Sequence, residues 1–464
     1  MGLSSVMDIA RGALNTYRTA QEVTGENIAN VNTPGYSRQR VILETAQPNG
    51  TSGFTIGTGV NIAKIERYYD GMLQQQLVNA QTPQGYDTTR SNVLQQVEQA
   101  FNEISNDGLG AAITGYFAAW QDLTLNPSGP TERQVLMSRA EILADNFHSA
   151  STTLSNTTSS LNTSLSPLTD SINNTLKSIA DLNGQIKNTE QLGGNSSATR
   201  DQRDQLIRDL SGQIGITYTE NTDGTTDIKY ADGGTALVTG LKAGAFSLTT
   251  NPGTGFYDVN LIPPEGAAAI VTPTTGQLGA VVSLRDTVVP GYMGKIDELA
   301  YNIATAVNAQ HSSGIDMNGN IGTDFFSAPV ALAGYASLIS TNLTSINEIA
   351  AADAFGELGN NVNAAAIANI SNQTFAFSTG TTTIDTHYAN VISQIGLEVQ
   401  TSNNTALRES AFTKQLTTLR ESNSGVSLDE EMTNLVKYQR SYQASAKLVT
   451  TATDMMDIVL SLVR

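Results

Sequence analysis

Apolar and small residues recur in alternating steps of four and three at both ends of this chain. One run covers residues 3–31 and the other covers residues 428–463. A heptad repeat of this kind predicts a long helix that buries a narrow seam against a partner helix, so we expect paired N- and C-terminal coiled-coil helices. At 1.5 Å per residue the two helices are expected to be about 43 and 54 Å long.

These two heptad runs have two interpretations. Stripes with a helical period usually mark helices that pack on the core of their own domain. Placement at both ends of the chain, with polar Gln21, Thr24, Gln439 and Thr453 at seam positions, instead favours helices that find partners in an assembly. The predicted self-assembly seam consists of Leu3, Met7, Leu14, Tyr17, Ile28, Val31, Leu428, Leu435, Tyr442, Val449, Met456 and Leu460.

Local signals mark the limits of both helices. A proline pushes the preceding residue out of the helical region, and Pro34-Gly35 suits a type II turn, so the first helix is expected to end within a residue or two of Asn32. Ser427 stands where an N-cap belongs and Glu430 follows three residues later. This spacing predicts a capping box at the start of the last helix.

Composition narrows the class of protein. The 464 residues include no cysteine, which removes thiolate catalysis and disulfides, and the net charge of -18 works against nucleic-acid binding. No apolar run approaches the roughly 20 residues that span a bilayer, so membrane insertion is not expected. The N-terminus lacks the features of a cleaved secretory signal, which leaves a cytosolic protein or one exported by another route.

The middle of the chain is mixed. Residues 36–69 show short β-type alternation, and helical periodicity dominates from residue 70 to about residue 215. Residues 216–284 are rich in Thr, Gly and Val with turn signals, and helical periodicity returns near residue 386. We therefore predict a mainly α, elongated multidomain protein with an inserted β-rich mixed domain.

Domain limits follow from these changes in pattern. Residues 1–66 and 425–464 form the predicted terminal coiled-coil region, residues 67–214 and 376–424 a helical domain, and residues 215–375 the insertion. A long helix is expected from Pro130 to Gly193-Gly194, kinked or split at Pro167. Further helices are expected at 290–310 and 386–420, with short strands near 325–345.

Residues that could carry chemistry are few. His148, His311 and His387 lie far apart and belong to no catalytic or metal-binding motif. The loop starting at Asp316 imitates the first ligands of an EF-hand, but Ile321 and Ser327 stand where its glycine and glutamate belong. A turn held by Asx hydrogen bonds is the better interpretation. We predict no catalytic, cofactor-binding or metal site and no cofactor.

The segment NIANVNTPGYSRQR at residues 27–40 resembles the signature that follows the first helix of flagellar rod, hook and hook-associated proteins. The final segment, from SGVSLDEEM onward, resembles the end of the same proteins, and SLDEEM with GYSRQR is closer to the hook–filament junction family than to hook proteins. The resemblance covers roughly the first 210 and last 80 residues. The signature turn consists of Asn27, Asn30, Asn32, Pro34, Gly35 and Tyr36.

This resemblance implies a non-enzymatic subunit of the flagellum that is exported unfolded and polymerises through paired terminal helices. The implied location is the extracellular hook–filament junction. The implied partners are further copies of the chain, the hook protein, a second hook-associated junction protein and a flagellar export chaperone.

Alternatives remain open at this stage. The chain could be another flagellar axial protein, such as a hook protein, or an axial scaffold that carries an enzyme domain in its insertion. A secreted coiled-coil adhesin is disfavoured, because it explains neither the residues 29–36 nor the two matching ends.

Overall fold

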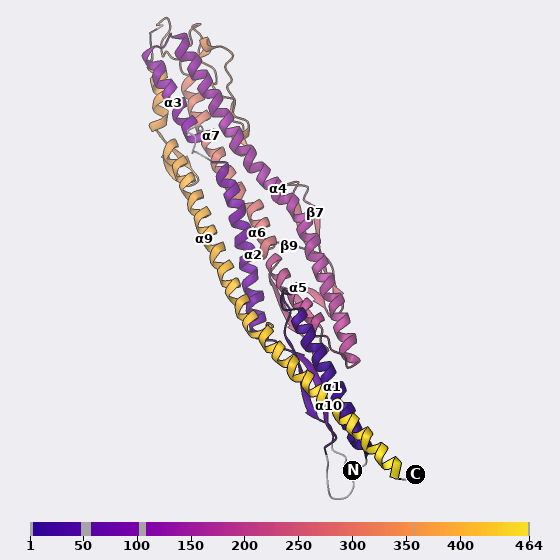
Figure 1. The fold of residues 1–464 in the computed structure, drawn as a ribbon. Coiled ribbons are helices and arrows are strands. Elements are labelled where there is room, and N and C mark those ends of the chain that lie inside the picture. The colour runs from indigo at the N-terminus through magenta and orange to yellow at the C-terminus, as the bar shows by residue number, and fades with distance from the viewer. Residues whose placement is uncertain (1–2, 48–56, 102–107, 358, 463–464) are drawn as a thin grey trace.

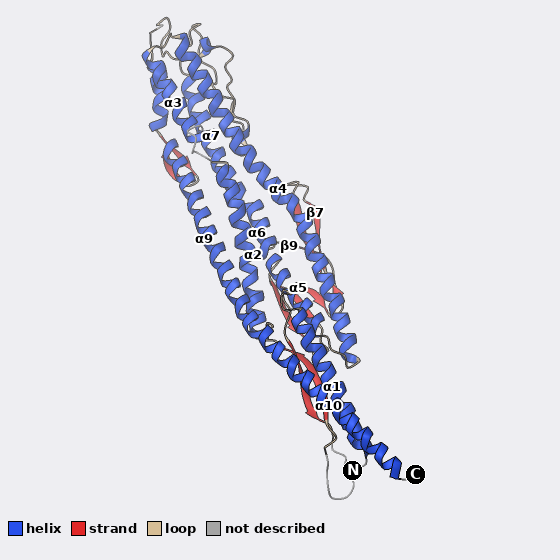
Figure 2. Ribbon diagram, in the orientation of Figure 1, coloured by secondary structure: helices blue, strands red, loops and turns tan. Residues whose placement is uncertain are grey.

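The computed structural model describes residues 3–47, 57–101, 108–357 and 359–462. It is an elongated rod with both chain ends at one tip, as Figure 1 shows. We call this tip the terminal end and the opposite tip the distal end. Helices run along the rod and the strands lie beside them, as the colours of Figure 2 show.

The described residues form ten α-helices and eleven strands. The helices are α1 (Leu3–Ala29), α2 (Gly71–Gln99), α3 (Leu109–Leu125), α4 (Pro130–Gln191), α5 (Ser197–Gln213), α6 (Gly276–Ser283), α7 (Val289–His311), α8 (Val362–Ala368), α9 (Ile384–Ser424) and α10 (Leu428–Leu462). The strands are β1 (Gln39–Thr45), β2 (Val60–Arg67), β3 (Ile216–Glu220), β4 (Thr226–Tyr230), β5 (Ala236–Thr239), β6 (Lys242–Ala243), β7 (Ala245–Thr250), β8 (Tyr257–Ile262), β9 (Ala269–Val271), β10 (Thr374–Phe377) and β11 (Gly380–Thr383).

The two terminal helices lie side by side, as predicted. Helices α1 and α10 pair along the terminal end of the rod, and the rings of Tyr17 and Tyr438 stack between them with centroids 6.4 Å apart. Helix α1 ends at Ala29, slightly before the predicted limit near Asn32. The antiparallel hairpin of β1 and β2 then packs against α1.

Helix α4 runs from the distal end along much of the rod and supplies a large part of its core. Its buried apolar residues repeat with helical spacing: Leu154, Leu161, Leu165, Leu168, Ile172, Leu176, Ile179 and Ile186. The expectation that Pro167 could split this helix was wrong, because the helix continues through it. Pro167 is exposed, so water can hydrogen-bond the carbonyl that the missing N–H leaves free.

The β-rich insertion is present. Strands β3 to β6 form a four-stranded antiparallel sheet, and β7 to β9 form a three-stranded one. One hydrophobic core nevertheless extends from Val78 to Ile395 and takes in these sheets, α4 and α7. The domain limits given above therefore remain a prediction, while the fold class, mainly helical with paired ends and an inserted β region, is confirmed.

The segment between α7 and α8 departs from expectation. Short strands were predicted near residues 325–345, but the described residues there form only an isolated bridge between Phe326 and Thr341 and a short turn of helix at Tyr335–Ser337. Side chains hold this segment in place of a sheet. Asp297 of α7 accepts backbone N–H bonds from Gly334 and Ala336, and burial raises the pKa of its carboxyl group.

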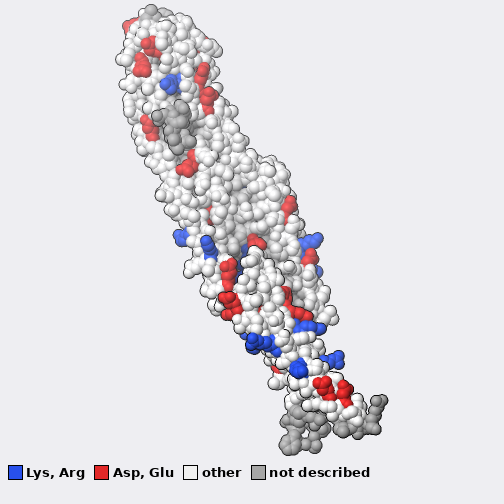
Figure 3. All heavy atoms as spheres, viewed as in Figure 1, with Lys and Arg blue, Asp and Glu red and all other residues white. Residues whose placement is uncertain are grey.

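Charge is distributed unevenly over the rod. On the face shown in Figure 3, most Lys and Arg side chains lie in the half nearer the terminal end, while the distal half shows mainly Asp and Glu. Among the described residues, no helix is both long and apolar enough to cross a bilayer.

His311 joins three segments at the distal end. Its Nδ1 lies 2.5 Å from the carbonyl oxygen of Thr323, and its Nε2 accepts the N–H of Ala350 at 2.9 Å. This pattern requires a neutral ring with the proton on Nδ1. Burial lowers the pKa of His311, because a charged ring would be desolvated and would lose the bond from Ala350.

This contact predicts acid-sensitive stability at the distal end. An unfolded histidine titrates near pH 6.5, whereas folded His311 has a lowered pKa and resists protonation. The contribution of His311 to the free energy of unfolding is therefore complete above about pH 6.5 and is lost as the pH falls below that value. Trp120 is the only tryptophan, and its ring centroid lies 6.2 Å from that of His311, so fluorescence-monitored urea unfolding reports on this region. His311→Gln should flatten the pH dependence, with His148→Gln as the control. An unchanged slope would contradict the assignment.

Candidate functional site

The signature turn lies where the terminal helices meet the body of the rod. Here α1 ends, the hairpin begins, and α9 gives way to α10. We call the side chains that connect these elements the joint, and its central members are Asn27, Tyr36, Arg38, Gln39 and Glu431.

Asn27 is the centre of the joint. It is 1% exposed and lies in the last turns of α1. Its Oδ1 accepts bonds from the Gln39 N–H and the Tyr36 hydroxyl, both at 2.9 Å. Its Nδ2 donates to the Gln39 carbonyl at 2.8 Å and to the Glu431 carboxylate at 2.9 Å. All four bonds that a side-chain amide can make are therefore satisfied.

Glu431 brings α10 into this network. Its carboxylate is 2% exposed and accepts, besides the bond from Asn27, a bond from Arg38 Nε at 2.7 Å. Arg38 also contacts Glu430 at 2.5 Å, and its backbone N–H donates to the carbonyl of Ser424 at 2.8 Å. A buried carboxylate is tolerated only with such partners, so Glu431 fixes the position of α10 relative to α1 and the hairpin. The Glu430 side chain thus pairs with Arg38 and does not bond back to Ser427, as the predicted capping box requires.

The turn itself is anchored to α5 and α9. Gly35 has φ +82°, and the N–H of Tyr36 donates to the carbonyl of Thr33, so the predicted type II turn is present. Arg420 of α9 donates to the carbonyl of Gly35 and, at 3.2 Å, to the hydroxyl of Ser37. The N–H of Ser37 in turn donates to Asp201 of α5 at 2.7 Å.

Buried ion pairs extend this anchor. Arg67 of β2 lies 2.7 Å from both Asp201 and Asp204. Burial raises the pKa of Asp201 despite this contact, because its carboxylate is removed from water. Burial and the nearby Arg420 lower the pKa of Arg208 to about 10. The joint is thus a low-dielectric, densely bonded region.

The turn predicts a strong effect of substitution at Gly35. A side chain there would need a positive φ, and its Cβ would lie 2.9 Å from Gln205 Oε1 and 3.2 Å from Arg208 Nη2. Gly35→Val should lower the free energy of unfolding of the monomer by about 1–3 kcal/mol in urea titrations. Gly25→Ala is the control, because no atom lies within 4 Å of its added Cβ. Equal stability of the two variants would show that the turn adapts.

The remaining signature residues contribute locally. Asn30 donates to the carbonyl of Glu26 at 3.0 Å and accepts from Thr33 at 3.0 Å. Asn32 and Pro34 are exposed. The sequence motif contained the joint residues Arg38 and Gln39, although they were not singled out. Gln39 bonds to Asn27 and Tyr36 within the motif, whereas Arg38 pairs with Glu430 and Glu431 near the other end of the chain.

The structure divides the predicted seam residues. Those half-buried along the pair of terminal helices are Leu3, Met7, Leu14, Tyr17, Ile28, Val31, Leu435, Val449 and Met456, whereas Leu428, Tyr442 and Leu460 are exposed. The most buried positions on α10 are Glu431, Ser445 and Ala452, which are small or polar. On α1 they include Ala10, Thr16 and Ala20. Helices that pack through small residues approach each other closely.

Many large apolar residues of α10 are exposed, and they are spread around the part of the helix that α1 does not cover. We call these side chains the outer surface of α10. They are Leu428 (47% exposed), Met432 (51%), Val436 (43%), Leu448 (50%), Met455 (53%), Ile458 (60%), Val459 (49%) and Leu460 (62%). So many exposed large apolar side chains on one helix are typical of a surface that a protein partner covers.

Other candidate sites show structural roles. The Asp316 carboxylate accepts the N–H of Asn320 at 2.7 Å, so the side chain of Asp316 holds this turn by a hydrogen bond to the backbone, as expected. The ring of His387 stacks on Phe377 with centroids 3.8 Å apart. In the described ranges no three His, Asp or Glu side chains gather as metal ligands.

Comparisons with known proteins match both terminal segments of the chain and much of its body. A family model described as the flagellar hook-associated protein FlgK helical domain matches residues 94–326, half of the chain. The chain belongs to the FlgK family of flagellar hook-associated proteins. Two further models, of the flagella basal body rod protein and of the C-terminal region of the basal body rod FlgEFG proteins, match residues 7–36 and 420–462. These are the two segments that the joint connects.

Relatives match over nearly their whole length. Flagellar hook-associated protein 1 of Bacillus subtilis is 28% identical, with 98% of this chain and 97% of the relative covered. The protein of the same name from Salmonella typhimurium is 26% identical, with 99% and 100% covered. The solved structure of the flagellar hook junction protein FlgK from Burkholderia pseudomallei has a similar fold, with a TM-score of 0.67, 17% identity, and coverage of 76% of this chain and 100% of that one.

Proposed function

We propose that this FlgK-family chain is a structural subunit that joins the flagellar hook to the filament and assembles through its terminal helices. The observation that carries the proposal is the outer surface of α10, because the pairing of α1 with α10 leaves its large apolar side chains uncovered. Neighbouring copies of the chain, the hook protein below and a second hook-associated junction protein above are the proposed occupants of the terminal region.

The joint gives this assembly a mechanical role. Asn27, Arg38 and Glu431 hold the paired terminal helices to each other and to the turn, and Ser37 and Arg67 hold the turn and the hairpin to α5 of the body. Force applied to the body is thereby passed to the assembled helices. We further propose export through the flagellar secretion system, with α10 held by an export chaperone until assembly, because an uncovered apolar helix would otherwise aggregate.

A strain that lacks the gene tests this function. Hooks should still form, flagellin should appear in the medium, and no filament should be attached; electron microscopy of cells and blotting of culture supernatants give both readouts. Complementation with the intact gene is the control. A strain without hooks would instead indicate a hook protein, and normal filaments would exclude a junction role.

A further inference from the structure

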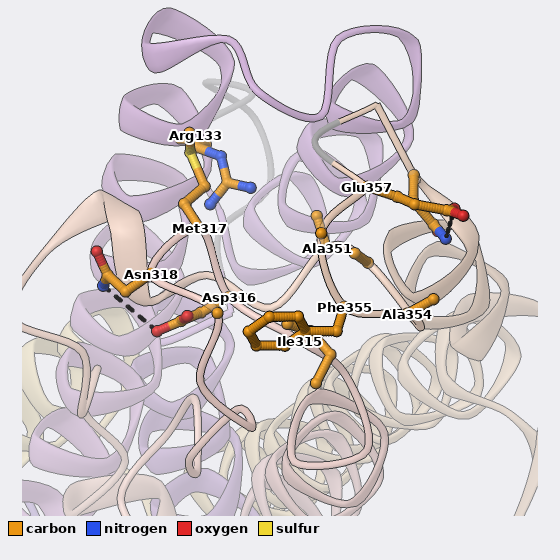
Figure 4. A pocket seen from close by; sticks show the side chains of 13 residues that line it. Arg133, Ile315, Asp316, Met317, Asn318, Ala351, Ala354, Phe355 and Glu357 are labelled. Carbon is orange, nitrogen blue, oxygen red and sulfur yellow. Dashed lines mark hydrogen bonds between the residues drawn. The ribbon is translucent and has the colours of Figure 1, made fainter.

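A small cavity lies at the distal end, far from the terminal helices. Two loops enclose it, one starting at Ile315 and the other around Phe355, and its volume is about 240 Å³ (Figure 4). Ligand pockets for drug-sized molecules are larger, at roughly 300–1,000 Å³. The space therefore suits only a small molecule.

Arg133 of α4 supplies the positive charge of the cavity. Arg133 is 3% exposed. Its guanidinium Nε donates to the carbonyl of Pro127 at 2.7 Å, and its Nη1 donates to the carbonyls of Ile346 and Ile349 at 3.0 and 2.8 Å. Within the described residues it forms no ion pair with a carboxylate. Burial lowers its pKa to about 10, so this guanidinium would gain from an anionic partner.

Carboxylates stand on other walls of the same cavity. Asp316 and Glu357 line it, and in the described part of the chain each is bonded to amide groups rather than to a cation. Figure 4 shows Arg133 and Asp316 on one side of the cavity and Glu357 on the other. A ligand with only a negative charge would meet these two acids, and one with only a positive charge would meet Arg133.

The remaining walls are apolar. Phe355 is 76% exposed and lies over Gly319, where an added Cβ would come within 2.9 Å of its ring. Ile315 and Ala351 line the cavity beneath it. An exposed aromatic ring beside small apolar residues offers a surface for an aliphatic group.

We propose that this cavity binds a free α-amino acid with an aliphatic side chain. The ligand carboxylate pairs with Arg133, its ammonium group pairs with Asp316 on the same side of the cavity, and its side chain packs on Phe355. A zwitterion has no net charge, so the acidic distal half of the rod does not repel it. The site is separate from the assembly surface and does not depend on the proposed junction role.

Isothermal titration calorimetry of the full chain with leucine and two analogues tests this assignment. 4-Methylpentanoate keeps the carboxylate and side chain, and 3-methylbutylamine keeps the ammonium and side chain. Leucine should bind saturably, and each analogue should bind at least about tenfold more weakly, since each leaves one charged group of the site unpaired. Equal binding of leucine and 4-methylpentanoate, or no binding of leucine at millimolar concentration, would overturn the proposal.

Variants locate the binding. Asp316→Asn keeps the acceptor for Asn320 but removes the charge, and Phe355→Ala removes an exposed ring, so both should fold and weaken leucine binding by about tenfold. Arg133→Gln should abolish binding, with circular dichroism to confirm folding. Val330→Ala is the matched control, because Val330 is 97% exposed and does not line the cavity. Unchanged binding by the first two variants would place leucine elsewhere.

Discussion

Replacing Leu448 and Met455 together by aspartate is expected to abolish filament attachment while the monomer still folds. Both side chains are about half exposed on the outer surface of α10, at 50% and 53%, so the isolated chain does not need them. In an assembled interface the two carboxylates would be buried without partners, at a cost of several kcal/mol in each subunit. Swimming motility, electron microscopy of hooks and circular dichroism of the purified chain measure these effects.

The same helix supplies a matched control for charge. Gln443 and Thr450 are also exposed and seven residues apart, but at about 100° per residue they lie on a different side of α10 from Leu448 and Met455. Their double aspartate variant carries the same added charge and should swim normally if the side with Leu448 and Met455 makes the contact. If both double variants swim alike, that side of α10 is not an assembly surface.

Removing Glu431 should release α10 from the body of the rod. Glu431→Ala leaves the buried amide of Asn27 without one of its acceptors, and it leaves Arg38 paired only with the exposed Glu430. Breaking a buried pair in this way costs about 3–5 kcal/mol. Limited proteolysis of the purified monomer should therefore cut near the start of α10 much faster than in the parent, and the strain should not attach filaments.

Its neighbour in sequence is the control. Glu430 also contacts Arg38, at 2.5 Å, but its side chain is 63% exposed. Glu430→Ala should cost less than about 1 kcal/mol and leave the cleavage rate nearly unchanged, because exposed ion pairs contribute little. Similar behaviour of the two alanine variants would show that the joint does not depend on burial of Glu431.

The sequence predicted the pairing of the two terminal helices better than it predicted which face of α10 is buried in that pair. The seam predicted on the last helix included Leu435, Val449 and Met456, which are half-buried, and also large residues such as Leu428 and Leu460, which are exposed. The structure instead buries Glu431, Ser445 and Ala452. A pattern search weighted by hydrophobicity overlooks small and polar residues that permit close helix contact, and it assigns to the interior those large ones that face outward.

The turn was predictable because its cause is local. Pro34 and Gly35 set the backbone angles by their own sterics, and Gly35 adopts the expected positive φ. The contact of Asn27 with Glu431 was not predictable, since nothing in the sequence near Glu431 indicates it. The short strands expected near residues 325–345 failed for a similar reason, because Asp297 and Asn308 of α7 hold that segment through side-chain bonds.

The bond between Asn27 and Glu431 joins residues 404 positions apart. Contacts between residues so far apart in sequence form late in folding. Closing the long loop between them costs chain entropy before the contact itself can stabilise the fold. The joint can therefore form only when both ends of one chain are present together, whichever end emerges first. A truncated or partly emerged chain has no closed joint, so the angle between its terminal helices and its body is not set. Closure of the joint thus depends on an intact chain.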